Sequence, residues 1–356
     1  MNKIFAFVLL LVFVGCKAPE KPVTKAEALQ LHNRLDSCLQ RRNGKAFDEL
    51  FNGTLLARRF KSKNILSDAA RSKGIREGLK NANLGNQIIR SLQTNDDSYS
   101  LVKHYETNGV QHLLYRLHGN DGLNYHDLEL ERYKGKVYIA DIYIYASGEN
   151  FSKTLSDLLE YKGESGLNEK KDFQDLLKIK ELFTQGRNEE AKKYFDKLDP
   201  GFKNQRSVQF MYVMVCSKLD EEIYLKALNQ FVSQYPNDAN TSLLMIDVYF
   251  LRKDYAKANL YVEKLDSIIN KDPYLDYYRA LITKSLGDIK GATKYLENLC
   301  KNMPEFSGGV IELIANYLDI EKYDKARDII NYYRNQKKFD QETLDHVLAI
   351  YPGYKE

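Results

Sequence analysis

The chain has 356 residues, of which 43% are apolar, 29% charged and 12% aromatic. This length and composition exclude a wholly disordered chain and suit about two packed domains. The 53 basic residues exceed the 49 acidic ones by only four, so the chain lacks the strong positive field of a typical nucleic-acid-binding protein and no nucleic-acid partner is expected.

The first residues predict a short secretion signal. Lys3 supplies a positive charge, residues 4–14 form an apolar run too short to span a bilayer, and a glycine stands before Cys16. The last four residues of this segment, Phe-Val-Gly-Cys, resemble the lipobox of bacterial lipoproteins, although Phe13 stands where that motif usually has Leu. The resemblance implies a signal peptide over 1–15 and an acylated Cys16; an ordinary cleaved signal is the alternative.

Acylation of Cys16 implies a lipid-anchored protein of the bacterial envelope. Each buried methylene contributes about 0.8 kcal/mol, so two or three acyl chains give stable membrane attachment. Lys17 stands where Asp signals inner-membrane retention in well-studied lipoproteins, so the resemblance implies the outer membrane, at its periplasmic face or at the cell surface. Residues 16–23 contain two prolines, two lysines and no apolar period, which predicts a flexible tether.

Residues 24–150 predict an α+β domain. A capping-box sequence from Thr24 to Glu27 begins a first helix, a second helix is predicted over 45–60, and a third stretch between 67 and 92 is interrupted by glycines. From residue 98 the apolar period changes to two. This change predicts a four-stranded antiparallel meander with hairpin turns, over 99–106, 110–117, 123–132 and 137–145.

Helices followed by a meander predict a sheet with helices over one face. This arrangement resembles the cone-shaped NTF2-like fold, in which the sheet lines a pocket. A generic sandwich of helices on a sheet is the alternative.

Counting residues from the predicted turns places five polar or aromatic side chains on one sheet face: His104, Tyr115, His126, Asp141 and Tyr143. The count sets His126 between Tyr115 and Tyr143 on the neighbouring strands. In an NTF2-like pocket His126 would act as a base and Asp141 would orient it. The alternative is that these are satisfied polar groups of the core or its rim.

Residues 151–171 predict a linker that contains a bridging helix, because Phe151, Leu155 and Leu158 recur at helical spacing before Gly163. An apolar strip is expected on the other face of the sheet. This strip is predicted to dock the first helix of the region that follows.

Residues 172–356 contain an internal repeat. The local pattern is a turn residue, an aromatic or branched residue, then an alanine, and a bulky side chain four positions later. The alanines are separated by 36, 31, 34 and 34 residues, a period of about 34. This pattern resembles the tetratricopeptide repeat (TPR) and implies an all-α superhelix of about five degenerate repeats; an unrelated helical bundle is the alternative. The alanines expected at the helix crossings are Ala191, Ala227, Ala258, Ala292 and Ala326.

These features together predict a membrane-anchored scaffold. Stacked TPR units form a curved groove, so the expected partner is an envelope protein or peptide bound in that groove. The alternative is an N-terminal domain that binds or weakly turns over a small molecule, with the repeats as a docking arm. The chain shows no familiar catalytic motif, and its cysteines lack metal-ligand spacing. No enzyme activity, cofactor or metal is therefore expected.

Overall fold

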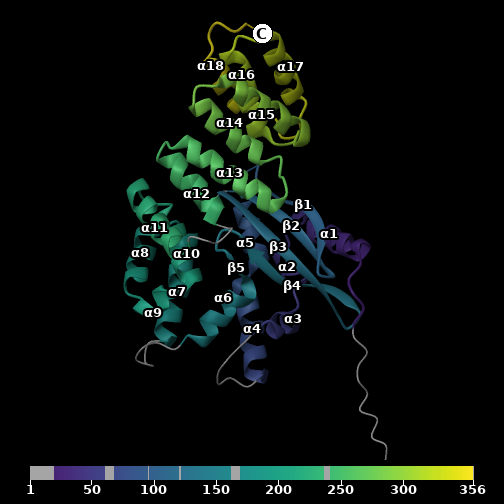
Figure 1. Cartoon of the computed structure of the whole chain (residues 1–356), viewed down its shortest axis with the longest axis vertical. Coiled ribbons are helices and arrows are strands. Elements are labelled where there is room, and N and C mark those ends of the chain that lie inside the picture. The colour runs from purple at the N-terminus through teal and green to yellow at the C-terminus, as the bar shows by residue number, and fades with distance from the viewer. Residues whose placement is uncertain are drawn as a thin grey trace, which may run out of the picture.

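The computed structural model describes residues 20–60, 68–94, 96–119, 122–161, 169–235 and 241–355. Helices and an antiparallel five-stranded sheet come first, and a long run of helices follows (Figure 1). This order confirms the predicted α+β region followed by an all-α region, although the sheet has five strands rather than four. The predicted signal peptide over 1–15 and Cys16 lie outside the described residues. No described helix is both long enough and apolar enough to cross a bilayer.

Helix α1 (Lys25–Gln40) begins at the predicted capping box. The Glu27 amide donates to Thr24 Oγ1 at 3.3 Å, and the Thr24 amide donates to the Glu27 carboxylate at 3.0 Å. These bonds satisfy backbone groups that a helix start leaves unpaired. Ala28, Leu31 and Leu35 form the buried stripe that packs this helix against the sheet.

The prediction of a single helix over 45–60 is wrong. The chain forms α2 (Gly44–Asp48) and α3 (Gly53–Arg58), and the segment between them pairs with the sheet. The Ile139 amide donates to the Leu50 carbonyl at 2.8 Å, and the Asn52 amide donates to the Ile139 carbonyl at 3.1 Å. Because these backbone bonds are made to the sheet, the helix is interrupted between its two parts.

The third predicted stretch is also two helices, α4 (Asp68–Ala82) and α5 (Leu84–Ser91). Helix α5 packs directly on α2. A Cβ atom added at Gly85 would lie 2.3 Å from the Gly44 carbonyl oxygen, so only a glycine permits this approach of the two backbones.

The sheet is a meander whose strands lie in chain order: β1 (Ser98–Thr107), β2 (Val110–Gly119), β3 (Gly122–Tyr133), β4 (Lys136–Ile144) and β5 (Glu149–Asn150). Two of the predicted hairpin turns are confirmed. The φ angles of Asn108 and Gly109 are 52° and 77°, and those of Lys134 and Gly135 are 51° and 77°. Two successive positive φ angles make the type I′ turn that matches strand twist.

Two predicted cross-strand pairs are confirmed in the first three strands. His104 lies opposite Leu113, and Tyr115 lies opposite His126. Leu113 and Tyr115 are completely buried in a core that the sheet forms with the N-terminal helices.

The predicted register is wrong in β4. Asp141 lies opposite Glu129 and Tyr143 lies opposite Asp127, one residue away from the expected partners. The cause is an irregularity after Glu129, where β4 contains one more residue than β3. A slip of one residue turns a side chain to the other face of the sheet, so Asp141 and Tyr143 leave the face of His126.

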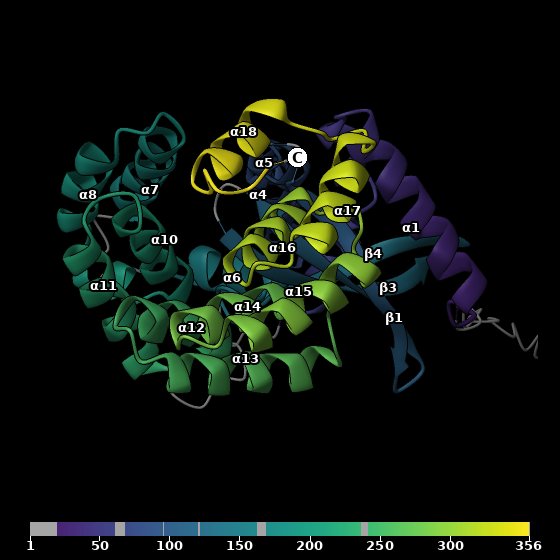
Figure 2. The same ribbon diagram turned by 90° about the horizontal axis from the view of Figure 1, so that it is seen from above.

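Helix α6 (Phe151–Glu160) leads from the sheet to helices arranged as antiparallel pairs. The pairs are α7 (Glu169–Thr184) with α8 (Asn188–Asp196), α10 (Arg206–Cys216) with α11 (Glu221–Gln234), α12 (Thr241–Leu251) with α13 (Tyr255–Ile269), α14 (Leu275–Ser285) with α15 (Ile289–Asn302), and α16 (Ser307–Asp319) with α17 (Tyr323–Arg334). The short α9 (Pro200–Lys203) precedes α10, and α18 (Gln341–Ala349) packs on α16. Figure 2 shows the pairs along an arc, with α8, α11 and α13 on its outer side. We call this set α7–α18 the helical array.

The five alanines of the sequence repeat all lie on the second helix of a pair. Ala191, Ala258, Ala292 and Ala326 have no exposed surface, and Ala227 is 5% exposed. A small buried side chain at each of these positions lets neighbouring helices approach closely.

The outer face of the sheet docks on the middle of the helical array, not on its first helix as expected. Asp272, just before α14, accepts hydrogen bonds from the Arg116 guanidinium and from the Tyr125 hydroxyl. Farther along, Asp96 accepts bonds from the first two amides of α16, those of Ser307 and Gly308, at 2.9 and 2.8 Å. Leu114, Leu123 and Tyr145 extend the same contact into one apolar core shared with the array. The sheet and the array are therefore joined over several hairpins.

Candidate functional site

The predicted site residue His126 is part of the inner core. It is 7% exposed, and its ring nitrogens lie 3.2 Å from the Tyr99 hydroxyl and 3.2 Å from the Asn124 amide. The Tyr99 and Tyr115 rings stack beside it with centroids 4.7 Å apart. Burial lowers the pKa of His126 to about 4. The imidazole is thus neutral near pH 7 and is enclosed by aromatic side chains.

Tyr115 and His104 occupy the same inner face and have partners of their own. The Tyr115 hydroxyl lies 2.6 Å from His32 Nδ1, and His104 Nε2 lies 2.5 Å from the Gln111 side-chain oxygen. These contacts match the alternative of satisfied polar groups in the core and at its rim.

Asp141 is on the other side of the sheet, against the start of α6. Its carboxylate accepts hydrogen bonds from the Ser152 hydroxyl at 2.5 Å and the Ser152 amide at 3.1 Å, and Arg59 Nε lies 3.7 Å away. Burial raises the pKa of this carboxyl group. Because the β4 irregularity separates Asp141 and Tyr143 from His126, the five predicted residues do not form one pocket.

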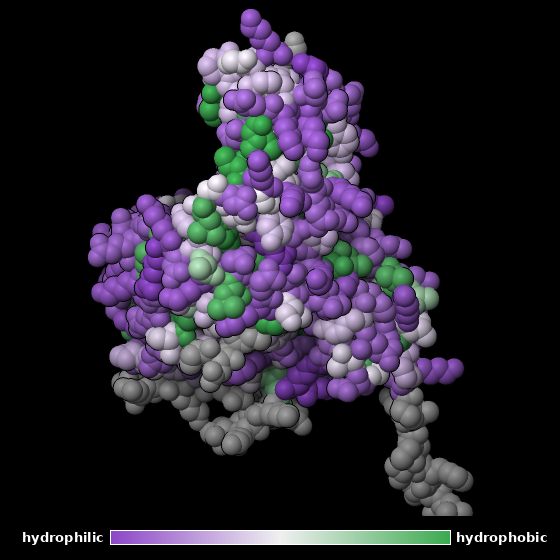
Figure 3. Space-filling view, turned by 45° about the horizontal axis from the view of Figure 1, so that its top comes forward, coloured by the Kyte–Doolittle hydropathy of each residue, from purple (hydrophilic) through white to green (hydrophobic). Residues whose placement is uncertain are grey.

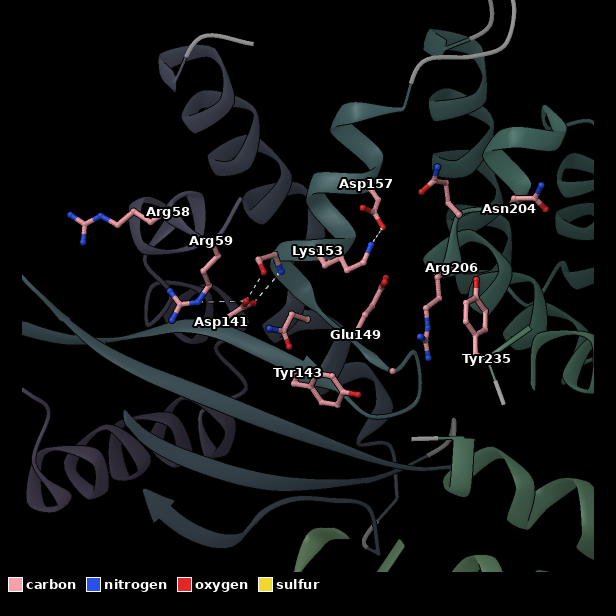
Figure 4. Close-up of a pocket in the computed structure, with 14 residues that line it drawn as sticks. Arg58, Arg59, Asp141, Tyr143, Glu149, Lys153, Asp157, Asn204, Arg206 and Tyr235 are labelled. Atoms are coloured by element: carbon pink, nitrogen blue, oxygen red, sulfur yellow. Dashed lines mark hydrogen bonds and ion pairs between the residues drawn. The ribbon is translucent and has the colours of Figure 1, made fainter. Parts of the chain in front are cut away.

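Asp141 and Tyr143 instead line a cleft of about 780 Å³ between the sheet and the helical array. One wall consists of the end of α3, the end of β4, β5 and the start of α6. The opposite wall consists of the start of α10 and Tyr235 (Figure 4). Apart from a glycine, every lining side chain is charged, is an amide, or carries a hydroxyl group. We call this feature the junction cleft.

Glu149 places a buried and only partly hydrogen-bonded carboxylate in the junction cleft. It is 4% exposed, and one carboxylate oxygen accepts a hydrogen bond from the Thr154 hydroxyl at 2.6 Å. The other oxygen is buried without a hydrogen-bond partner. Burial raises the pKa of the Glu149 carboxyl group. The carboxylate points toward the space between Lys153 and Arg206 (Figure 4).

The cations of the cleft are held in place by their neighbours. Arg206 donates to the Ser147 carbonyl, and its guanidinium lies 4.2 Å from the centre of the Tyr235 ring. Lys153 forms an ion pair with Asp157 one helical turn later. Oriented charges and amides of this kind suit a polar ligand with both donors and acceptors rather than an apolar one.

The described residues contain no group of three His, Cys, Asp or Glu side chains placed to hold a metal ion. Searches against family models, curated proteins and solved structures found no match. The residues that line the junction cleft come from several separate segments of the chain. Of these, Glu149, Arg206 and Tyr235 were not predicted, because they are far apart in the sequence and belong to no local motif.

Proposed function

We propose that this protein is a lipid-anchored scaffold of the bacterial envelope that binds a segment of a partner protein at the junction cleft and along the adjoining inner side of the helical array. The observation that carries the proposal is the docking of an array of helical hairpins onto a sheet, which leaves a polar cleft at their junction. In an array of this kind each helical hairpin contacts only the hairpins next to it. The array as a whole therefore presents an extended binding surface.

The proposal includes the assignment of the array as degenerate TPR units. Its support is the period of about 34 residues, the antiparallel pairing of successive helices, and the burial of an alanine on each second helix. The resemblance of the N-terminal region to the NTF2-like fold stays a prediction.

The chemistry of the surface favours a polar partner segment. On the face shown in Figure 3, hydrophobic residues lie in small separate groups among hydrophilic ones. A broad apolar interface is thus not a feature of that face. The small-molecule alternative has less support, because the inner sheet face that was expected to line its pocket is packed with Tyr99, Tyr115 and the N-terminal helices.

Photo-crosslinking in cells tests the proposal. A photoreactive amino acid is placed at Lys153 and at Asn204, on opposite walls of the junction cleft, and at Lys290 on the distant helix α15 as a control. Both cleft positions are expected to give the same adduct, and the control position is expected to give none. Identical adducts at all three positions, or none in the cleft, would contradict a partner at this site. Mass spectrometry of the peptide that contains Cys16 separately tests the lipid anchor.

A further inference from the structure

The β3–β4 hairpin forms hydrogen bonds with the chain just before α1. The Arg132 guanidinium donates to the Lys21 carbonyl at 2.9 Å and to the Pro22 carbonyl at 3.3 Å. It also binds the Glu27 carboxylate at 2.6 Å, and this hydrogen bond lowers the pKa of Glu27 to about 2. The hydrogen bonds from Arg132 to the backbone are therefore supported by its ion pair with Glu27, which persists well into the acid range.

A second contact comes from the turn of the same hairpin. The Lys134 amide donates to the Glu20 carboxylate at 2.6 Å. Within the predicted tether over 16–23, residues 20–23 are thus held against the fold. Each residue of an extended chain spans at most about 3.6 Å, so Glu20 cannot lie more than about 15 Å from Cys16. A lipid on Cys16 would keep the hairpin tip close to the bilayer surface.

Four lysines surround this point of attachment, and all are exposed: Lys21, Lys25, Lys134 and Lys136. Within the described part of the chain, no ion pair joins them to a carboxylate. We call these four lysines, with Tyr133, the hairpin-tip surface. Its ammonium groups are available to an external anion.

Tyr133 adds an amphipathic ring between two cations. The Arg58 guanidinium and the Lys134 ammonium each lie 5.4 Å from the centre of its ring. Tyrosine rings flanked by basic side chains are suited to the headgroup region of a bilayer, where the ring meets apolar matter and its hydroxyl meets water.

We propose that the hairpin-tip surface lies against an anionic lipid bilayer and orients the whole protein on it. The inference rests on the proposed lipid anchor at Cys16, which brings this surface within reach of the headgroups. The lysines then add an electrostatic contact that a single-point anchor lacks. Because the sheet and the helical array are joined, this contact also sets the direction in which the junction cleft faces.

Vesicle binding by the chain from residue 16 onward, with Cys16→Ser, tests this contact without acyl chains. That chain retains every residue that the structure describes. Vesicles of phosphatidylcholine with about one third phosphatidylglycerol are compared with phosphatidylcholine alone, at about 0.1 M and 1 M salt, since the Debye length falls from about 10 to about 3 Å. We expect binding only to the anionic vesicles and only at low salt.

Lys134→Asn with Lys136→Gln is the variant that tests the surface, because Asn tolerates the positive φ angle at position 134. Each lysine removed is expected to weaken partitioning about fivefold. The matched control is Lys290→Gln with Lys294→Gln on α15, which removes the same charge from exposed positions of the array. It is expected to leave binding nearly unchanged, and circular dichroism verifies that both variants are folded.

Three results would overturn the inference: equal binding to neutral vesicles, equal weakening by the control pair, or binding to soluble polyglutamate but not to anionic vesicles. None of these results depends on whether Cys16 is acylated in cells. An unmodified Cys16 peptide would overturn the anchor, while the vesicle measurement would still report on the lysines.

Discussion

Replacing Asp272 with alanine is expected to lower the free energy of unfolding by about 3–5 kcal/mol. Asp272 is 2% exposed and accepts hydrogen bonds from Arg116 and from the Tyr125 hydroxyl. Arg116 is 6% exposed, so the variant leaves a buried guanidinium without its charge partner. Chemical denaturation followed by circular dichroism measures the loss.

Asp324→Ala is the matched control, because this aspartate is 98% exposed and pairs with Arg327 at the surface. Such pairs contribute little, so its stability is expected to stay close to that of the native chain. A double variant, Asp272→Leu with Arg116→Met, removes both charges and is expected to recover part of the lost stability. If Asp272→Ala were as mild as Asp324→Ala, the ion pair would not hold the sheet to the array.

Acidification from pH 7.5 to pH 4.5 is expected to cost about 2–3 kcal/mol of stability through His126 alone. Its pKa is about 4 in the folded chain, because burial opposes the charged form, and 6.5 is the ordinary value that applies after unfolding. Between pH 6.5 and pH 4, His126 is protonated in the unfolded chain but remains neutral in the folded chain. The folded state therefore has its full stability, as far as His126 is concerned, above pH 6.5, and loses stability as the pH falls toward 4.

Carboxyl groups titrate in the same range, so the quantity to measure is a difference between two proteins. Denaturation of the native chain and of His126→Gln at both pH values gives the loss of unfolding free energy for each protein. The native chain is expected to lose about 2–3 kcal/mol more than the variant over this interval. Equal losses would show that His126 is not held neutral in the core.

The strands and their turns followed from the sequence because both are local. Alternation of apolar residues and the Asn108-Gly109 and Lys134-Gly135 dipeptides set the hairpins, and the structure has type I′ turns at both places. In the turns before α8 and α15, Gly186 and Gly287 have φ angles of 73° and 87°, a left-handed conformation that glycine adopts without strain after a helix.

The junction cleft could not be predicted because it depends on one non-local detail. The irregularity after Glu129 turns Asp141 and Tyr143 away from His126, and no residue in that stretch marks it. The opposite wall of the cleft comes from the start of α10 and from Tyr235, and only the docking of the array brings these residues near the sheet.

Local sequence patterns also could not predict where the sheet docks on the helical array. An apolar strip on the sheet indicated that something packs there, but the contact is set by the buried pair of Arg116 and Asp272, 156 positions apart in the chain. From the sequence alone, arginine and aspartate side chains are expected at the surface and not as a buried pair.

The junction cleft has a fixed shape only if the sheet and the helical array form one rigid body. Electron paramagnetic resonance between spin labels at Glu106→Cys on the sheet and Glu222→Cys on α11, with the native cysteines replaced, measures this directly. A single narrow distance distribution is expected, which broadens when Asp272→Ala is added. A broad distribution in the otherwise native chain would contradict the account.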